Sequence, residues 1–210
     1  MAFSPFKITA VEVHPAEELF RKLREVVMLR NREIRPYEDA ELSLERMPFE
    51  EFRPAQRYVL VPELQKVRHL GFELRDRGQD PADLDGYLTL RIAGVPEPVD
   101  LLPPVIERHT EADGTAVNVV NDGMHRLYAA RLEWRTPRVL YAKNLPPECP
   151  YYAYPIPGPF PWEKVEIVNA EKVPEGFLKK WHRIRNNKEL YRDFNSAFQN
   201  VGGPRGGGAA

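Results

Sequence analysis

A short segment near the middle of the chain combines residue types that bind phosphate. Residues 122–126 are Asp122, Gly123, Met124, His125 and Arg126. Glycine lets an anion approach the backbone, arginine offers a permanently charged fork that matches phosphate oxygens, and histidine donates a hydrogen bond or a proton near neutral pH. These residues, called loop 122–126 below, therefore indicate a phosphate-binding loop.

This chemistry requires loop 122–126 to join a strand to the N-terminus of a helix. Residues 115–121 are rich in β-branched side chains and predict a strand, which we expect to be an interior one. After Gly123 the apolar spacing becomes helical, and residues 138–142 return to a strand pattern. Free N–H groups and the helix dipole favour an anion at such a junction. We expect the helix to begin within about two residues of Gly123.

The same spacing has an interpretation without chemistry. Asp122 can be an ordinary N-cap, Gly123 a turn residue, and His125 and Arg126 surface residues, since short glycine-containing loops before helices are common. If phosphate does bind, Asp122 is expected to hold Mg²⁺ or to take a proton from a nucleophile, because a carboxylate beside phosphates is otherwise poorly tolerated.

The segments before loop 122–126 predict strands and helices that frame it. Residues 8–13 indicate a strand followed by a helix with Glu18 in its first turn, and Pro62 opens a second helix. Residues 87–92 alternate as a half-buried strand. Residues 37–51 hold six acids and one base, which favours a solvated insertion on the surface away from the site.

The segments after the loop are more irregular. Residues 146–161 contain seven prolines and predict a fixed connector, and residues 176–198 have helical character. Residues Lys179–Arg192 hold six bases and one acid, a pattern typical either of a solvated helix face or of contact with a nucleic-acid backbone. Residues 201–210 are rich in glycine and predict a disordered tail.

The predicted fold is α/β (α+β), with a small mixed sheet flanked by helices. Residues 1–145 form the expected domain with a helical insertion at about 35–86, residues 146–200 a Pro-rich connector and C-terminal helical extension, and residues 201–210 the tail. The 210 residues are 42% hydrophobic with a formal charge of -1, so they can bury a core and show no global basic field. A lone cysteine and the lack of about 18 consecutive apolar residues predict a cytoplasmic protein outside the membrane.

Loop 122–126 also carries a family resemblance. Followed by Ala129 and Ala130 and preceded by Pro103-Pro104-Val105-Ile106, it resembles the signature region of the ParB/sulfiredoxin superfamily, over about residues 99–144. It is nearest to the Asp-Gly-His-His-Arg motif of the free-serine kinases, although Met124 stands where they have a second histidine. Sulfiredoxins have a catalytic cysteine at that position, and partition-type ParB proteins have a Gly-Glu-Arg-Arg motif.

The resemblance implies a bound ATP or another nucleoside triphosphate or diphosphate with Mg²⁺. Gly123, Met124, His125 and Arg126 would bind the nucleotide and Asp122 the metal, with Asp122 and His125 as catalytic residues. In the kinases an acidic residue from the N-terminal region is the base, and Glu18 is the candidate by position.

Three functions follow from these patterns. The first is a phosphotransferase or nucleotide hydrolase that transfers a phosphoryl group to an unidentified small molecule or to water. The second is a ParB-like DNA-binding protein, nuclease or DNA-modification accessory protein that uses Lys179–Arg192. The third is a non-catalytic nucleotide sensor. Fold alone does not choose among them, because function depends on the site.

Overall fold

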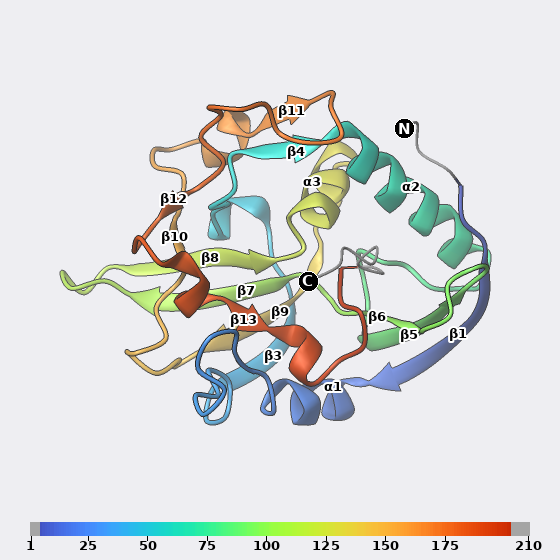
Figure 1. The fold of residues 1–210 in the computed structure, drawn as a ribbon, viewed down its shortest axis with the longest axis horizontal. Coiled ribbons are helices and arrows are strands. Elements are labelled where there is room, and N and C mark those ends of the chain that lie inside the picture. Colours follow the sequence, from blue (N-terminus) through green and yellow to red (C-terminus); the bar gives the residue numbers. More distant parts are fainter. Residues whose placement is uncertain (1–4, 203–210) are drawn as a thin grey trace.

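The computed structural model describes residues 5–202, which form an α+β fold with three α-helices (Figure 1). Within this range no helix is long and apolar enough to span a membrane. In chain order the elements are β1 (Ile8–Pro15), α1 (Ala16–Leu23), β2 (Val27–Met28), β3 (Glu41–Arg46), η1 (Phe49–Glu51), β4 (Tyr58–Leu60), α2 (Val61–Arg75), β5 (Gly86–Ile92), β6 (Val99–Leu101), β7 (Val105–Thr110), β8 (Ala116–Asp122), α3 (Met124–Leu132), β9 (Arg138–Lys143), β10 (Ala153–Tyr154), η2 (Pro161–Lys164), β11 (Glu166–Val168), β12 (Trp181–His182), η3 (Asn187–Leu190), β13 (Arg192–Asp193) and η4 (Phe194–Ser196).

The main sheet has the strand order β3-β9-β7-β8 and is mixed, as expected, because β7 and β9 are parallel while the other pairs are antiparallel. Alternate residues of β9 face opposite sides. Val139 and Tyr141 join the core beneath α2 and α3, whereas Leu140 and Ala142 join the core that contains Leu19 of α1. Both faces of the central strands are therefore covered by helices.

A second sheet has the order β1-β5-β6 and is antiparallel throughout. Leu88 and Leu90 of β5 pack with Leu74 near the end of α2, whereas Leu64 near the start of α2 packs with the core of the main sheet. The helix α2 thus spans the space between the two sheets (Figure 1).

The acidic stretch at residues 37–51 is not a solvated insertion. Its strand β3 pairs along its length with β9, and the Tyr37 side chain is fully buried. In β3 the charges of Glu41 and Glu45 alternate with Leu42 and Leu44, so the acids reach solvent while the backbone completes the sheet. None of its residues lines the cavity at loop 122–126 that is described below, although Met47 packs in the same core cluster as Met124.

Two further predictions are wrong. The strand β8, predicted to be interior, lies at the edge of the main sheet. Its outer side forms one isolated β-bridge, between Val119 and Arg53. Residues 176–198 form short strands and 3-10 turns instead of a helix. At helical spacing Phe177, Trp181, Ile184 and Leu190 would share an inward face. Trp181 and Ile184 are exposed whereas Leu190 is buried, so these residues do not form one buried apolar face. Most of the predicted tail, residues 203–210, lies outside the described range.

A buried ion pair attaches the C-terminal extension to the main sheet. The fork of Arg192 donates to both carboxylate oxygens of Glu107, from Nε to Oε1 at 3.0 Å and from Nη2 to Oε2 at 2.9 Å, and both side chains are fully buried. The Tyr37 hydroxyl donates to Oε1 at 2.6 Å, and His109 Nε2 lies 2.9 Å from Oε2. The remaining Arg192 donors reach three backbone carbonyls, those of Cys149, Pro150 and Leu190. The pair is thus satisfied on every side.

Arg192→Met tests this pair. The substitution leaves the Glu107 carboxylate buried without its main countercharge, and we expect the free energy of unfolding in urea to fall by about 3 to 5 kcal/mol. The control is Arg21→Met, which breaks the exposed pair between Arg21 and Glu25 at 3.2 Å and should cost less than about 1 kcal/mol. Similar losses in the two variants would contradict the assignment.

The same pair predicts a pH dependence. Burial alone would raise the pKa of Glu107, but the charge of Arg192 and the hydrogen bonds from His109 and Tyr37 outweigh it and hold the pKa at about 2. Because the folded-state pKa is depressed, the stabilisation is present above the unfolded value of about 4.3 and is lost as the pH falls towards about 2. We therefore expect the difference in unfolding free energy between the wild type and Glu107→Gln to shrink between about pH 5 and pH 2. A difference that is constant over this range would show that Glu107 does not titrate as described.

Candidate functional site

Loop 122–126 joins β8 to α3 through one left-handed residue. The strand ends at Asp122, the helix begins at Met124, and Gly123 between them has φ 86° and ψ 20°. A Cβ at Gly123 would lie 2.8 Å from Cβ and 2.9 Å from Cα of Pro104. Glycine is thus required both by the backbone conformation and by the close approach of Pro104. The helix begins where the sequence predicted.

The first turn of α3 has no side-chain cap. The N-cap residue is Gly123, and the Asp122 carboxylate binds Arg126 instead of the helix backbone. The interpretation of Asp122 as an N-cap is therefore wrong. The N–H groups of the first helical turn have no acceptor within the helix, and the helix dipole adds partial positive charge there.

Arg126 is built into the wall of the site. Its Nη2 donates to Asp122 Oδ2 at 3.0 Å and its Nη1 donates to the carbonyl of Leu102. Only 12% of its side chain is exposed. Arg126 thus presents a fixed positive charge that Asp122 partly balances, and it is not the free surface residue of the alternative interpretation.

His125 is held in one tautomer. The Leu60 N–H donates to its Nε2 at 3.2 Å, so the ring proton of the neutral imidazole lies on Nδ1. Burial lowers the pKa of His125, with the charges of Glu63 and Asp122 acting in the opposite direction. The residue is therefore a neutral hydrogen-bond donor through Nδ1 near neutral pH.

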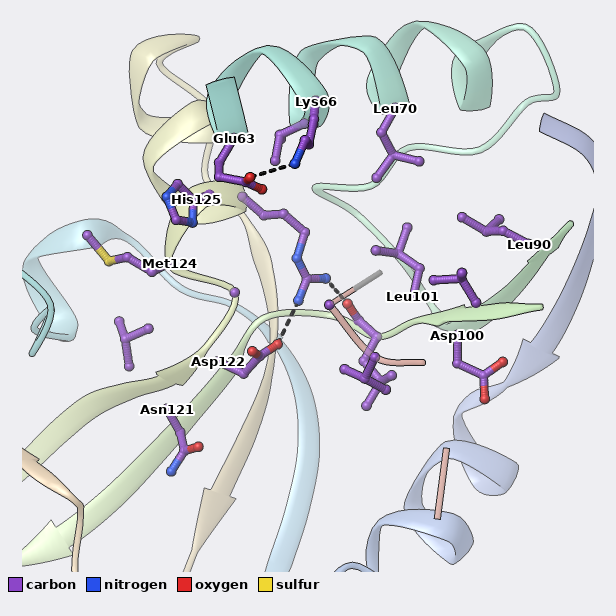
Figure 2. Close-up of a pocket in the computed structure, with 18 of the residues that line it drawn as sticks. Glu63, Lys66, Leu70, Leu90, Asp100, Leu101, Asn121, Asp122, Met124 and His125 are labelled. Atoms are coloured by element: carbon purple, nitrogen blue, oxygen red, sulfur yellow. Dashed lines mark hydrogen bonds and ion pairs between the residues drawn. The ribbon is translucent and has the colours of Figure 1, made fainter. Parts of the chain in front are cut away.

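These residues line a cavity of about 520 Å³ between α2, α3 and the second sheet (Figure 2). One part of its wall is polar and contains loop 122–126. Another part is aliphatic, with Leu70 from α2, Leu90 from β5 and Leu101 from β6. The volume lies within the range of about 300 to 1,000 Å³ that is usual for small-molecule sites.

The structure brings together all the predicted site residues except one. Asp122, Gly123, Met124, His125 and Arg126 line the cavity, and Met124 also packs in the main core. Glu18 is not among the lining residues. The Glu18 carboxylate accepts a hydrogen bond from the Tyr87 hydroxyl at 2.9 Å and lies 3.2 Å from Nδ1 of His14. The hydrogen bond from Tyr87 is the main reason that the pKa of Glu18 is lowered.

The side chains at the cavity suit a metal ion that is bound together with a nucleotide. Among the described residues there is no group of three or more His, Cys, Asp or Glu side chains that could hold a metal ion. Mg²⁺ commonly uses one or two carboxylates plus the phosphates of a substrate, so Asp122, whose side chain is 34% exposed, fits that ion when a nucleotide supplies the other ligands.

Sequence reasoning missed several polar residues of the cavity, among them Lys66, Asn121 and Lys180. Lys180 of the C-terminal extension lines the same wall as Asn121 and Tyr152. In the sequence it was only one member of the basic run at Lys179–Arg192. That run does not form a single face, because Arg192 is buried in the main fold and Lys180 lines the cavity.

An α+β domain that carries a strand-glycine-helix loop on the wall of a cavity is the arrangement expected of a ParB-like protein. The family model described as the ParB CE domain matches residues 18–166, more than half of the chain, and the chain belongs to that family. No curated protein and no solved structure matches the chain at a significant level.

Two glycine substitutions test how the loop is held. Gly114 in the turn between β7 and β8 has φ 84°, close to that of Gly123, but a Cβ there would meet nothing within 4 Å. We expect Gly114→Ala to cost about 1 kcal/mol for the left-handed conformation, whereas Gly123→Ala should cost at least about 1 kcal/mol more because of the clash with Pro104. Urea denaturation measures both values. Equal losses would mean that the contact with Pro104 does not constrain the loop.

Proposed function

We propose that the cavity binds an ATP-type nucleotide, a nucleoside triphosphate or diphosphate, with its phosphates at the N-terminus of α3. The observation that carries the proposal is that the uncapped first turn of this helix opens at the wall of the 520 Å³ cavity. Uncapped helix N-termini after a glycine are suited to phosphate, because the N–H groups and the dipole act together.

The charges on the wall support the proposal. Three cations line the cavity, namely Lys66, Arg126 and Lys180, together with the carboxylates of Glu63, Asp100 and Asp122. Asp100 is satisfied within the fold, because Thr89 Oγ1 donates to it at 2.6 Å and the backbone N–H of Gln199 at 2.9 Å. Asp122 faces the loop, where Mg²⁺ would screen its charge from the phosphates.

The proposed reaction is transfer of the terminal phosphoryl group to a small hydroxyl compound or to water. Bound Mg²⁺ would supply charge neutralisation on the phosphates. Among the protein groups, Arg126 would contribute a fixed positive charge, and His125 would donate a hydrogen bond from Nδ1 to a phosphoryl oxygen. Asp122 would hold the metal or orient the nucleophile. A protein that binds the nucleotide and shows no turnover would instead be a nucleotide sensor.

Nucleic-acid binding is the second candidate, and it is favoured by a separate surface. Tyr154 and Trp181 are opposite each other in the pairing of β10 with β12 and are 42% and 60% exposed. The guanidinium of Arg183 lies 5.5 Å from the centre of the Tyr154 ring. Exposed aromatic rings beside bases can stack nucleobases. Salt-sensitive binding of DNA without nucleotide would favour this candidate.

Calorimetric titration of ATP with and without Mg²⁺ tests the nucleotide proposal. We expect Mg²⁺-dependent binding that Arg126→Ala weakens by more than about tenfold, because the variant loses a charge and leaves Asp122 unbalanced beside the phosphates. The control is Arg131→Ala on the same helix, since Arg131 does not line the cavity. Circular dichroism must first show that Arg126→Ala is folded, because Arg126 also holds Leu102. The proposal fails if the wild type does not bind ATP.

A further inference from the structure

Lys180 reaches the cavity from a part of the chain that follows the family match at residues 18–166. Its backbone forms a bridge with Gln56, and the next residues form β12, which pairs with β10 (Figure 1). The neighbouring backbone N–H of Arg57 donates to the carbonyl of Lys179 at 3.0 Å. The position of Lys180 at the cavity wall is thus fixed by pairing on two sides.

The ammonium group of Lys180 differs from the other cations of the cavity. Lys66 is paired with Glu63 at 2.6 Å and Arg126 with Asp122 at 3.0 Å. Lys180 Nζ instead donates to the Tyr152 hydroxyl at 2.8 Å and lies 4.4 Å from the centre of that ring. Within residues 5–202 no carboxylate forms an ion pair with it, so the protein balances its charge only in part.

A second polar group on the same cavity is left without a hydrogen bond. The Nδ2 atom of Asn121 is buried and forms no hydrogen bond with any described residue. Leaving a buried donor unsatisfied costs about 1 to 3 kcal/mol, so such a group calls for an explanation. The unmet groups at the cavity are thus an ammonium, an amide N–H₂ and the first N–H groups of α3. All of them are donors, and together they suit a ligand with several anionic acceptor oxygens.

We propose that Lys180, together with Asn121, forms a second anion-binding wall of the cavity, and that Lys180 binds the terminal phosphate of the ligand. The inference rests on the proposed nucleotide function and adds to it that the C-terminal extension completes the site. Loop 122–126 holds one part of the polyphosphate chain, and Lys180 provides the unbalanced positive charge for the other.

The surroundings of Lys180 give the site a pH dependence. Burial lowers the pKa of Lys180, with opposing contributions from Tyr191, Tyr58 and Asp122. Four other titratable groups near it do not gain charge as the pH rises from neutrality: burial raises the pKa of Tyr152 and of Tyr191, and lowers the pKa of His125 and of His182. Since an anion binds the protonated amine, affinity falls as the pH rises through the lowered pKa of Lys180.

Two lysine substitutions test the proposal. Binding of Mg²⁺-ATP and of inorganic pyrophosphate is measured by calorimetry for the wild type, Lys180→Met and Lys179→Met. Lys179 is an exposed neighbour in the same basic run and serves as the matched control. We expect Lys180→Met to weaken binding of both ligands by more than about tenfold and Lys179→Met to leave it within about twofold.

Lys180→Arg separates a binding role from a structural one. Arginine keeps its charge at high pH, so this variant should retain most of the affinity and lose the pH dependence. Between about pH 7.5 and pH 10, where ATP is fully ionised, we expect wild-type affinity to fall and that of Lys180→Arg to stay level. A wild-type affinity that stays level with that of Lys180→Arg up to about pH 10.4, the ordinary pKa of lysine, would overturn the role of the amine.

The remaining outcomes also decide the question. Equal affinities of Lys180→Met and the wild type, or equal losses in both methionine variants, overturn the inference. Binding of pyrophosphate that depends on Lys180, without binding of any nucleotide, leaves the inference standing and refutes the nucleotide function; no binding of either ligand by the wild type refutes both. If Lys180→Met does not fold, acetylation of Lys180 in the wild type is measured by mass spectrometry with and without ATP. We expect bound ATP to protect Lys180 from acetylation, and lack of protection counts against the proposal.

Discussion

The buried pair of Glu107 and Arg192 is the interaction on which the arrangement of the chain most depends. At this pair the strand β7, the extension at β13 and the connector carbonyls of Cys149 and Pro150 meet within hydrogen-bond distance. Arg192 also pairs through its backbone with Met28 of β2. A buried arginine with so many partners fixes the register of each segment, because a shift in any of them would leave a charge or a carbonyl unsatisfied. The end of the extension is thereby held against the main sheet.

A second constraint acts locally and is steric. Gly123 turns the chain from β8 into α3 against Pro104, which leaves no room for a side chain. That turn also sets the relative positions of Asp122 and Arg126, whose ion pair spans one helical turn. The arginine of the loop is therefore held by the fold, and its charge is partly balanced before any ligand arrives. A phosphate with several negative charges would need further positive charge from elsewhere on the wall.

The sequence allowed prediction of local features and failed where the outcome depended on distant partners. The junction at Gly123 was predictable because glycine and the change of apolar spacing lie within a few residues. The strand β3 was missed because its acids were counted without regard to their alternation with Leu42 and Leu44. The prediction of a helix at residues 176–198 was wrong because the spacing of apolar residues does not show whether they will pack against a core. The approach of Lys180 to loop 122–126 depends on pairing with Gln56 and β10, for which the sequence holds no local signal.

Lys180 and Arg192 show how a structural cation and a ligand-directed cation can be told apart within one basic run. Both are withdrawn from solvent, and burial of a charge is costly unless partners compensate for it. Arg192 has a carboxylate and three carbonyls, so its partners within the protein account for its burial. Lys180 has one hydroxyl and two aromatic rings, those of Tyr152 and Tyr191, so the folded protein compensates its charge only in part. Since Lys180 faces a cavity whose other unmet groups are donors, an anionic ligand is the partner that would complete its coordination. The difference between the two residues therefore supports the view that the extension is both fastened to the domain and part of its binding site.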